Sequence, residues 1–304
     1  MRRKEHFWTA VYALLLVVYT LYAALDTFVV SRVYTAVPEE TTSAVETPYS
    51  APLSAGESRE PIVTENSYQD ESISIVLTEY RAYDTTIYVA EVTLASPTYL
   101  KTVLAQGAYG RNVTEKTSSM AARSGALLAI NGDYYGVQES GYVIRNGVLY
   151  RDTPSRGQED LVIWADGTFG IISEDEVTAQ ALLDAGAVQV LSFGPALVTE
   201  GTIAVSQSEE VGRAMASNPR TAIGIFSEGH YVFVVSDGRT NESEGLSLYE
   251  LAEFMQALGV QTAYNLDGGG SSTMVFNGTL VNNPTTNGNS IKERSVSDCV
   301  CISY

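Results

Sequence analysis

Short apolar runs separated by turn residues fill the chain from Ile73 to its end, and they limit the folds open to it. Runs such as residues 73–77 and 86–94 are short and rich in β-branched side chains, which is typical of strands. Asn146-Gly147 and Asp166-Gly167 are turn signals that predict hairpins between neighbouring strands. The pattern predicts an α+β fold: one domain over residues 73–304, built on an extensive mixed or antiparallel β-sheet with a few helices.

A few segments carry helical signals instead. Residues 248–258 repeat apolar side chains at helical spacing, and Gly259 is a suitable end for that helix. Residues 117–123 predict one short helix. Residues 174–185 predict another, with acidic residues in its first turn, where they favour the helix dipole.

The N-terminus sets a second constraint. Residues 7–25 contain no charged side chain and follow Arg2, Arg3 and Lys4. A membrane-spanning helix needs about 20 apolar residues, and basic residues ahead of it place the N-terminus inside. We therefore predict that residues 1–30 form a cytoplasmic tip and a transmembrane signal anchor in the cell membrane, with the rest extracytoplasmic. A cleaved signal peptide is the alternative, but the segment is long for one and no small-x-small site follows.

The next segment has a different composition. Residues 37–70 are rich in Ser, Thr, Pro and Glu and contain few large apolar side chains. Such a segment cannot bury enough apolar surface to offset the entropy of ordering. We predict that residues 31–72 form a flexible stalk that holds the domain away from the membrane.

Charge and residue counts exclude several classes of protein. The chain has 18 Lys and Arg against 36 Asp and Glu, so it repels nucleic acid, and we predict no nucleic-acid partner. It has only two histidines, His6 and His230, and the second lies in a predicted hairpin turn. Cys299 and Cys301 are expected to be buried thiols, because a disulfide across one residue is strained. No metal-binding motif is present, so we predict no metal and no cofactor.

The segment from Ala263 to Met274 carries the densest set of candidate functional residues. Asp267 ends the predicted strand 260–266 and is followed at once by Gly268, Gly269, Gly270, Ser271 and Ser272. Glycines allow positive φ angles and close approach of a ligand, and successive amides in such a turn can bind an anion. A tight structural turn is the alternative. No Gly-Lys-Ser/Thr follows, so this is not a P-loop.

Two further aspartates share this setting at a strand end beside glycine. Asp133 follows the apolar run 126–130, and Asp237 follows the run 231–236. Carboxylates at strand ends can meet at one rim of a sheet, and hydrolysis of a glycosidic bond uses a carboxylate pair. We predict Asp133 and Asp267 as acid, base or nucleophile, and Asp237 as a third catalytic candidate. For Asp237 an ordinary turn is the alternative.

A phosphate-containing substrate also needs local positive charge. Arg220 is the main candidate because its guanidinium fork matches two phosphate oxygens, and a surface ion pair is its alternative. Tyr134 or Tyr135 can form a stacking wall. The other candidates for substrate or phosphate binding are Asn131, Thr221, Arg239, Asn265, Arg294, the amides of Gly268, Gly269 and Gly270, and the hydroxyls of Ser271 and Ser272.

Four motifs in fixed order resemble those of the phosphodiester glycosidase family. They are Asn-Gly-Asp-Tyr-Tyr at 131–135, Asn-Pro-Arg-Thr-Ala-Ile-Gly at 218–224, Ser-Asp-Gly-Arg at 236–239 and Asn-Leu-Asp-Gly-Gly-Gly-Ser-Ser-Thr at 265–273. The similarity covers residues 73–304. It implies a hydrolase that converts a sugar-1-phosphodiester, such as an N-acetylhexosamine-1-phosphodiester, to free sugar and phosphomonoester, with the matched positions forming the active site.

The anchor and stalk set this chain apart from animal members of the family. We therefore expect a membrane-anchored, extracytoplasmic glycoside hydrolase that acts on phosphodiesters of cell-envelope or exopolysaccharide glycans. A non-catalytic carbohydrate-binding or exopolysaccharide-assembly module is the alternative. A phosphatase-type cleavage is a third possibility, and it differs in releasing inorganic phosphate rather than sugar first.

Overall fold

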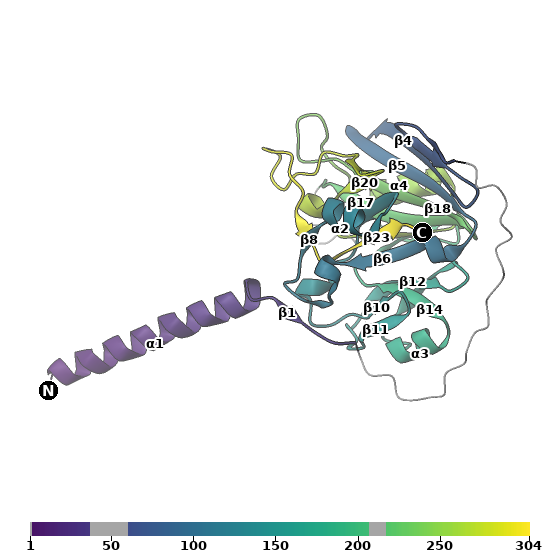
Figure 1. Ribbon diagram of the computed structural model, residues 1–304. Coiled ribbons are helices and arrows are strands. Elements are labelled where there is room, and N and C mark those ends of the chain that lie inside the picture. Colours follow the sequence, from purple (N-terminus) through teal and green to yellow (C-terminus); the bar gives the residue numbers. More distant parts are fainter. Residues whose placement is uncertain (1, 37–59, 207–216) are drawn as a thin grey trace.

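Strands dominate the described part of the computed structural model, residues 2–36, 60–206 and 217–304 (Figure 1). The largest sheet has nine strands. In spatial order these are β16 (Thr202–Ile203), β15 (Ala196–Thr199), β19 (Thr262–Leu266), β17 (Arg220–Ser227), β18 (His230–Ser236), β5 (Thr85–Leu94), β4 (Ile73–Ala82), β3 (Ser67–Gln69) and β2 (Ile62–Val63). The strands that are paired in the described residues run antiparallel, which confirms the predicted α+β class.

Two five-stranded sheets pack against this large sheet. One contains β21 (Thr279–Leu280), β20 (Met274–Phe276), β9 (Leu128–Asn131), β23 (Asp298–Ile302) and β6 (Leu100–Leu104). The other contains β11 (Val148–Arg151), β10 (Val143–Arg145), β14 (Ala187–Leu191), β12 (Glu159–Trp164) and β13 (Phe169–Ser173). Their apolar faces share one core, in which Phe233, Ile130 and Leu161 each represent a different sheet. The smaller pairs are β22 (Ser295–Val296) with β8 (Glu115–Lys116), and β1 (Arg32–Val33) with β7 (Gly110–Arg111).

Helix α4 (Leu248–Leu258) covers the outer face of the large sheet, as the apolar spacing predicted. Ser247 and Glu250 form a capping box at its start, and Gly259 ends it at φ 92°. The short helix α2 (Thr117–Ser124) is also confirmed. Single helical turns occur at η1 (Pro97–Tyr99), η2 (Ala105–Gly107), η3 (Tyr135–Val137) and η5 (Gly269–Ser271).

The helix predicted at residues 174–185 is wrong in its first half. Helix α3 spans only Ala179–Asp184, and the Thr178 side chain caps it by accepting from the Ala181 amide. Glu174 is buried outside the helix, where its carboxylate accepts hydrogen bonds from distant parts of the chain. Glu174, the first of the acidic residues that suggested a helical turn, is therefore used in tertiary contacts.

The predicted hairpins are confirmed because their turn residues adopt the required backbone. Asn146-Gly147 joins β10 to β11 with positive φ at both residues. Asp166-Gly167 joins β12 to β13, and the Asp166 carboxylate accepts from the Thr168 amide at 2.9 Å. Cys299 and Cys301 are buried, free thiols on β23, as expected.

The N-terminal helix α1 (Arg2–Phe28) projects from the domain (Figure 1). Its segment Phe7–Phe28 is long and apolar enough to cross a membrane. Most of the predicted stalk falls on residues 37–59, which lie outside the described residues. The domain includes residues before the predicted boundary at residue 73, since β2 and β3 extend the large sheet and the Tyr68 side chain is buried in the core.

Candidate active site

A cavity of about 210 Å³ lies where β9 and β19 end. Its lining includes Asp133, Asp267, Ser271 and Arg294, and the walls are completed by Thr114, Tyr134, Val137, Ser295, Val296 and Ser297. The Asp267 amide donates to the Gly132 carbonyl at 3.3 Å, which joins the two strand ends. Two of the predicted aspartates therefore meet at the junction of two sheets.

Asp133 is held rigidly in this cavity. Its Oδ1 accepts from the Tyr135 amide at 3.0 Å. Its Oδ2 accepts from Arg145 Nη2 at 2.7 Å and from the Ser192 amide at 3.0 Å. Because both oxygens have donors, the carboxylate keeps one orientation, which suits a group that must face a reacting atom.

Arg145 is a functional residue that sequence reasoning missed. Its guanidinium is fully buried and bridges two acids: Nη2 donates to Asp133, and Nε donates to Asp298 Oδ2 at 2.7 Å. Burial raises the pKa of Asp298 to about 7, although the charge of Arg145 opposes the shift. The sequence offered no signal for this contact, because Arg145 looks like the last residue before a turn and Asp298 lies 153 positions away.

Asp267 faces Arg294 across the cavity. Its Oδ2 accepts from Arg294 Nη2 at 3.1 Å, and Arg294 Nε donates to Ser271 Oγ at 2.9 Å. Burial raises the pKa of Asp267, while Ser271 and Arg294 act in the opposite direction. The Arg294 side chain is 42% exposed, so part of its guanidinium is open to a ligand.

The main arginine candidate and one aspartate do not line this cavity. Arg220 is buried beside it, and its Nε donates to the Leu246 carbonyl at 2.8 Å. Asp237 accepts from the Asn283 amide at 2.8 Å and from Asn283 Nδ2 at 3.0 Å. Asp237 thus fastens the segment after β21 to the large sheet. Arg294 takes the place in the cavity that was expected for Arg220.

Several predicted binding residues form hydrogen bonds within the protein instead of facing the cavity. Asn131 Oδ1 accepts from Thr221 Oγ1 at 2.8 Å and from the Thr273 amide at 3.1 Å. Asn265 Nδ2 donates to the Gly194 carbonyl at 2.7 Å. Arg239 holds the neighbouring loops, donating to Asn218 Oδ1 and to the Thr286 carbonyl. These side chains shape the site without lining it.

The glycine segment is a tight turn, and the amide of Gly269 is used within the protein. The Gly269 amide donates to the Pro219 carbonyl at 2.7 Å, and Gly269 has φ 62°. A Cβ atom on Gly270 would lie 2.4 Å from Thr286 Oγ1, and one on Gly268 would lie 2.9 Å from the Pro219 carbonyl oxygen. The glycines are therefore required by the turn and by close packing. The Gly269 amide is used within the protein, and anion binding by the Gly268 and Gly270 amides stays a prediction.

Four other predicted side chains differ in whether they line the cavity. Tyr134 lines the cavity and is 41% exposed. Tyr135 is buried, stacks on Tyr109 at 5.2 Å between ring centroids, and donates from its hydroxyl to the Ser297 carbonyl. Both serines are buried, but only Ser271 lines the cavity. Tyr134 is thus the one of the two tyrosines that can contact a sugar.

Two buried acids, Glu174 and Asp160, lie next to the residues that hold Asp133. Glu174 accepts from the Tyr142 amide at 2.9 Å and from Ser192 Oγ at 3.1 Å, and the Ser192 amide in turn donates to Asp133. The oxygens of Asp160 accept no hydrogen bond among the described residues. Burial, followed by the Glu174 carboxylate, raises the pKa of Asp160 to about 9. Asp160 can therefore keep its proton at a pH where an ordinary carboxyl has lost it.

This pair predicts a pH-dependent stability. The folded protein keeps a proton on Asp160 that the unfolded chain releases above the ordinary pKa of 3.8, so the free energy of unfolding falls as pH rises from there to about 9. Asp160→Asn can keep a donor to Glu174 without titrating. We expect its Tm to decline less than that of the wild type between pH 6 and pH 9 in thermal unfolding. Exposed Asp152→Asn is the matched control, and equal slopes in all three proteins would contradict the assignment.

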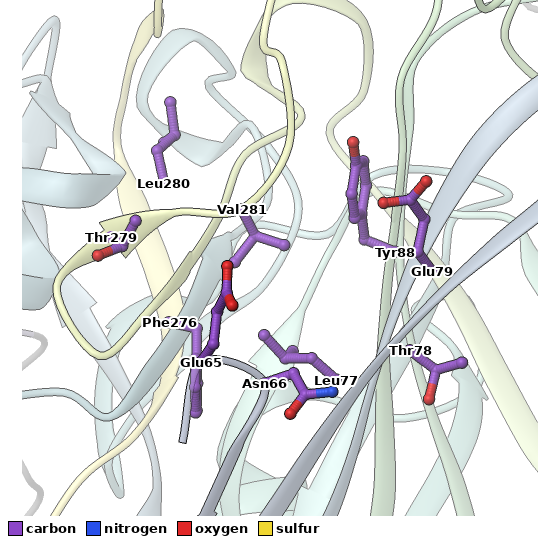
Figure 2. Close-up of a pocket in the computed structure, with 10 residues that line it drawn as sticks. All are labelled: Glu65, Asn66, Leu77, Thr78, Glu79, Tyr88, Phe276, Thr279, Leu280 and Val281. Carbon is purple, nitrogen blue, oxygen red and sulfur yellow. The ribbon is translucent and has the colours of Figure 1, made fainter. Parts of the chain in front are cut away.

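A second cavity, of about 450 Å³, lies between the β4–β5 hairpin and the β20–β21 turn (Figure 2). Glu79 and Tyr88 are cross-strand neighbours there, and Glu65 approaches from the other side. No lysine or arginine lines this cavity, so it does not suit a phosphate. The smaller cavity is the better candidate for the active site.

The chain is similar to known proteins. Residues 124–303 match the profile of the phosphodiester glycosidase family. The chain is 31% identical over 229 residues to mouse N-acetylglucosamine-1-phosphodiester alpha-N-acetylglucosaminidase, covering 69% of this chain and 44% of that protein. It is 33% identical over 206 residues to the SPbeta prophage-derived protein YomE of Bacillus subtilis, covering 64% and 31%. The chain therefore spans less than half the length of the curated relatives it matches.

The fold is also similar to a solved structure. The catalytic domain of zebrafish N-acetylglucosamine-1-phosphodiester alpha-N-acetylglucosaminidase, auto-inhibited by its pro-peptide, superposes with a TM-score of 0.61 and 25% sequence identity. The match covers 76% of this chain and 83% of that one. The family profile spans more than half of the chain and includes Asp133, Asp267 and Arg294. The chain belongs to the phosphodiester glycosidase family.

Proposed function

We propose that this protein hydrolyses a sugar-1-phosphodiester, such as an N-acetylhexosamine-1-phosphodiester, to free sugar and phosphomonoester. The observation that carries the proposal is the meeting of Asp133, Asp267 and Arg294 in one cavity. Two carboxylates supply what glycosidic bond cleavage needs, and a guanidinium suits a phosphate leaving group. The name of the mouse relative supports this substrate class.

The environments of the two carboxylates suggest different roles. Asp267 is buried and its pKa is raised, so it can hold a proton and donate it to the departing phosphate oxygen. Asp133 is fixed by three hydrogen bonds and can stabilise positive charge at the anomeric carbon or direct the attacking water. Arg294, which contacts Asp267, is positioned to neutralise charge that develops on the phosphate.

The test is a turnover assay with product identification. The purified protein is incubated with methyl α-N-acetylglucosamine-1-phosphodiester, and the products are followed by mass spectrometry. We expect free N-acetylglucosamine and methyl phosphate. Release of methanol or inorganic phosphate first would indicate phosphatase chemistry. Binding without turnover over a panel of sugars would indicate the non-catalytic binding module instead.

The proposal includes the location of the enzyme. Helix α1 contains one apolar segment of membrane-spanning length, preceded by Arg2, Arg3 and Lys4. We propose that it anchors the catalytic domain on the extracytoplasmic side of the membrane, where glycan phosphodiesters of the cell envelope or of exopolysaccharides would be substrates. Protease accessibility of the domain in intact cells tests this orientation.

A further inference from the structure

The end of helix α1 is fastened to the catalytic domain by one side chain. Asn112 Nδ2 donates to the carbonyls of Thr27 and Val30, both at 3.1 Å, and Ser31 Oγ donates to the Asn112 carbonyl at 2.9 Å. The last carbonyls of a helix have no partner within the helix. Asn112 therefore caps α1 from the domain.

The strand that follows α1 also docks on the domain. β1 pairs with β7, and the Tyr34 amide donates to the Tyr109 carbonyl at 2.9 Å. A Cβ atom on Gly110 would lie 2.0 Å from the Arg32 carbonyl oxygen, so this contact requires glycine at position 110. Only residues 29–31 separate α1 from β1. The structure shows no free tether between the helix and the domain.

The loop that binds the helix end also builds the cavity wall. Thr114, which lines the cavity, lies two residues beyond Asn112 and hence within about 7 Å of it along the chain. The Asn112 amide donates to the Gly136 carbonyl at 3.1 Å, next to Val137 of the cavity lining. In Figure 1, α1 meets the domain on the side that carries β1 and β8.

This geometry sets the height of the cavity above a bilayer. The apolar segment ends at Phe28, which places Asn112 at the boundary of the hydrocarbon layer. The headgroup layer is about 5–8 Å thick on each side. The cavity therefore lies at the level of lipid headgroups, where the phosphate of a lipid is found.

Exposed apolar side chains lie at the end of the helix, on β1 and at the cavity, together with the charged side chains of Arg32 and Glu139. Six exposed side chains form this apolar rim: Val29, Val30, Val33, Tyr34, Tyr134 and Val137. Val33 is 65% exposed in the described structure, and Tyr134 and Val137 also line the cavity. Such side chains are unfavourable in water but suit the interface of a membrane. The rim therefore includes residues at the end of the membrane segment and residues of the cavity lining.

We propose that the substrate is an amphiphilic sugar-1-phosphodiester whose lipid stays in the bilayer that holds α1. This inference rests on the proposed glycosidase function. Water attacks the anomeric carbon and gives up a proton to Asp133, the bond from that carbon to the phosphate ester oxygen breaks, and the proton held by Asp267 goes to the phosphate. The sugar leaves as the free hemiacetal, and the lipid phosphomonoester remains in the membrane.

The test uses the full chain in phosphatidylcholine proteoliposomes with two substrates. One is hexadecyl α-N-acetylglucosamine-1-phosphodiester in the same vesicles, and the other is the methyl diester in solution. We expect hydrolysis of the hexadecyl diester to be at least about tenfold faster at equal total concentration, because the cavity is held at the surface where this substrate is concentrated.

An insertion tests whether the faster hydrolysis of the hexadecyl diester depends on the docked helix and not on the catalytic step. Ten Gly/Ser residues between Phe28 and Val29 allow the domain to move away by about 17 Å on average. We expect the hexadecyl rate to fall at least about tenfold while the methyl diester rate is unchanged. The same insertion within residues 37–59 is the matched control, because it follows β1 and leaves the docking intact. Asn112→Gly, which tolerates the positive φ of 56° at this position, should lower the hexadecyl rate in the same direction.

The outcomes distinguish the two proposals. Equal rates for both diesters in the wild type would overturn the lipid substrate and leave the glycosidase in place. A lipid preference that survives the insertion before β1 would overturn the role of the docked helix. Hydrolysis of neither diester would reject the glycosidase itself, and the lipid substrate with it.

Discussion

Asp267→Asn is expected to lower kcat for a sugar-1-phosphodiester by about 10³-fold or more without unfolding the protein. The amide has nearly the shape of the acid and can still accept a hydrogen bond from Arg294, but it cannot deliver a proton. The measurement is kcat by release of free sugar, with far-UV circular dichroism and Tm recorded on the same sample. Asp267 is 8% exposed, so the isosteric change is preferable to alanine, which would open a hole beside Ser271.

Asp237→Asn is the matched control for this substitution. Asp237 is a buried aspartate at the end of a neighbouring strand, but it contacts Asn283 and does not line the cavity. We expect a lower Tm, since one of the two oxygens that accept hydrogen bonds from Asn283 is replaced by an NH2 group, and kcat within about tenfold of the wild type. Comparable losses of kcat in the two variants, or full activity in Asp267→Asn, would remove Asp267 from the proposed mechanism.

Arg145→Met is expected to destabilise the protein by about 3–5 kcal/mol and to inactivate it. The substitution keeps much of the side-chain volume but removes the cation that the carboxylates of Asp133 and Asp298 share. Two buried acids would then be left without a counter-charge, and one of them would have to take up a proton. Asp133 would also lose the donor that fixes its orientation. Urea denaturation at pH 7 measures the stability.

Two further variants test this explanation. Arg156 is exposed, so Arg156→Met should change the free energy of unfolding by less than about 0.5 kcal/mol. The double variant Arg145→Met with Asp298→Asn removes one of the stranded charges, and we expect it to recover part of the lost stability but not the activity. If Arg145→Met unfolds at the same urea concentration as the wild type, the buried ion triad does not contribute to folding as argued.

Features that depend on neighbouring residues were predictable. The β10–β11 and β12–β13 hairpins follow from turn dipeptides, and α4 follows from its apolar spacing with Ser247, Glu250 and Gly259 at its ends. The first half of the predicted helix at 174–185 failed because Glu174 bonds to Tyr142 and Ser192, and nothing in the local pattern reveals that contact. Local propensity was overridden by tertiary contacts in this case.

In the candidate site, too, features set by neighbouring residues could be predicted and features set by tertiary contacts could not. Asp133 and Asp267 could be predicted because each follows an apolar strand and lies beside glycine. A tight structural turn was one of the two alternatives for the glycine segment, and Gly269 has the positive φ of such a turn. The sequence did not reveal which arginine contacts these aspartates. Arg220 and Arg294 both precede a hydroxyl residue, but the first points to the Leu246 carbonyl and the second to Asp267.

The sequence by itself determined the strands, the turns, the apolar N-terminal segment and the two aspartates, because periodicity and turn chemistry act over a few residues. Only the tertiary structure decided that Arg145 bridges Asp133 and Asp298, and that Asn112 holds the end of α1 beside the cavity. Those contacts join residues 12, 153 and 85 positions apart. Their partners are set by how whole sheets pack, which no short stretch of sequence encodes.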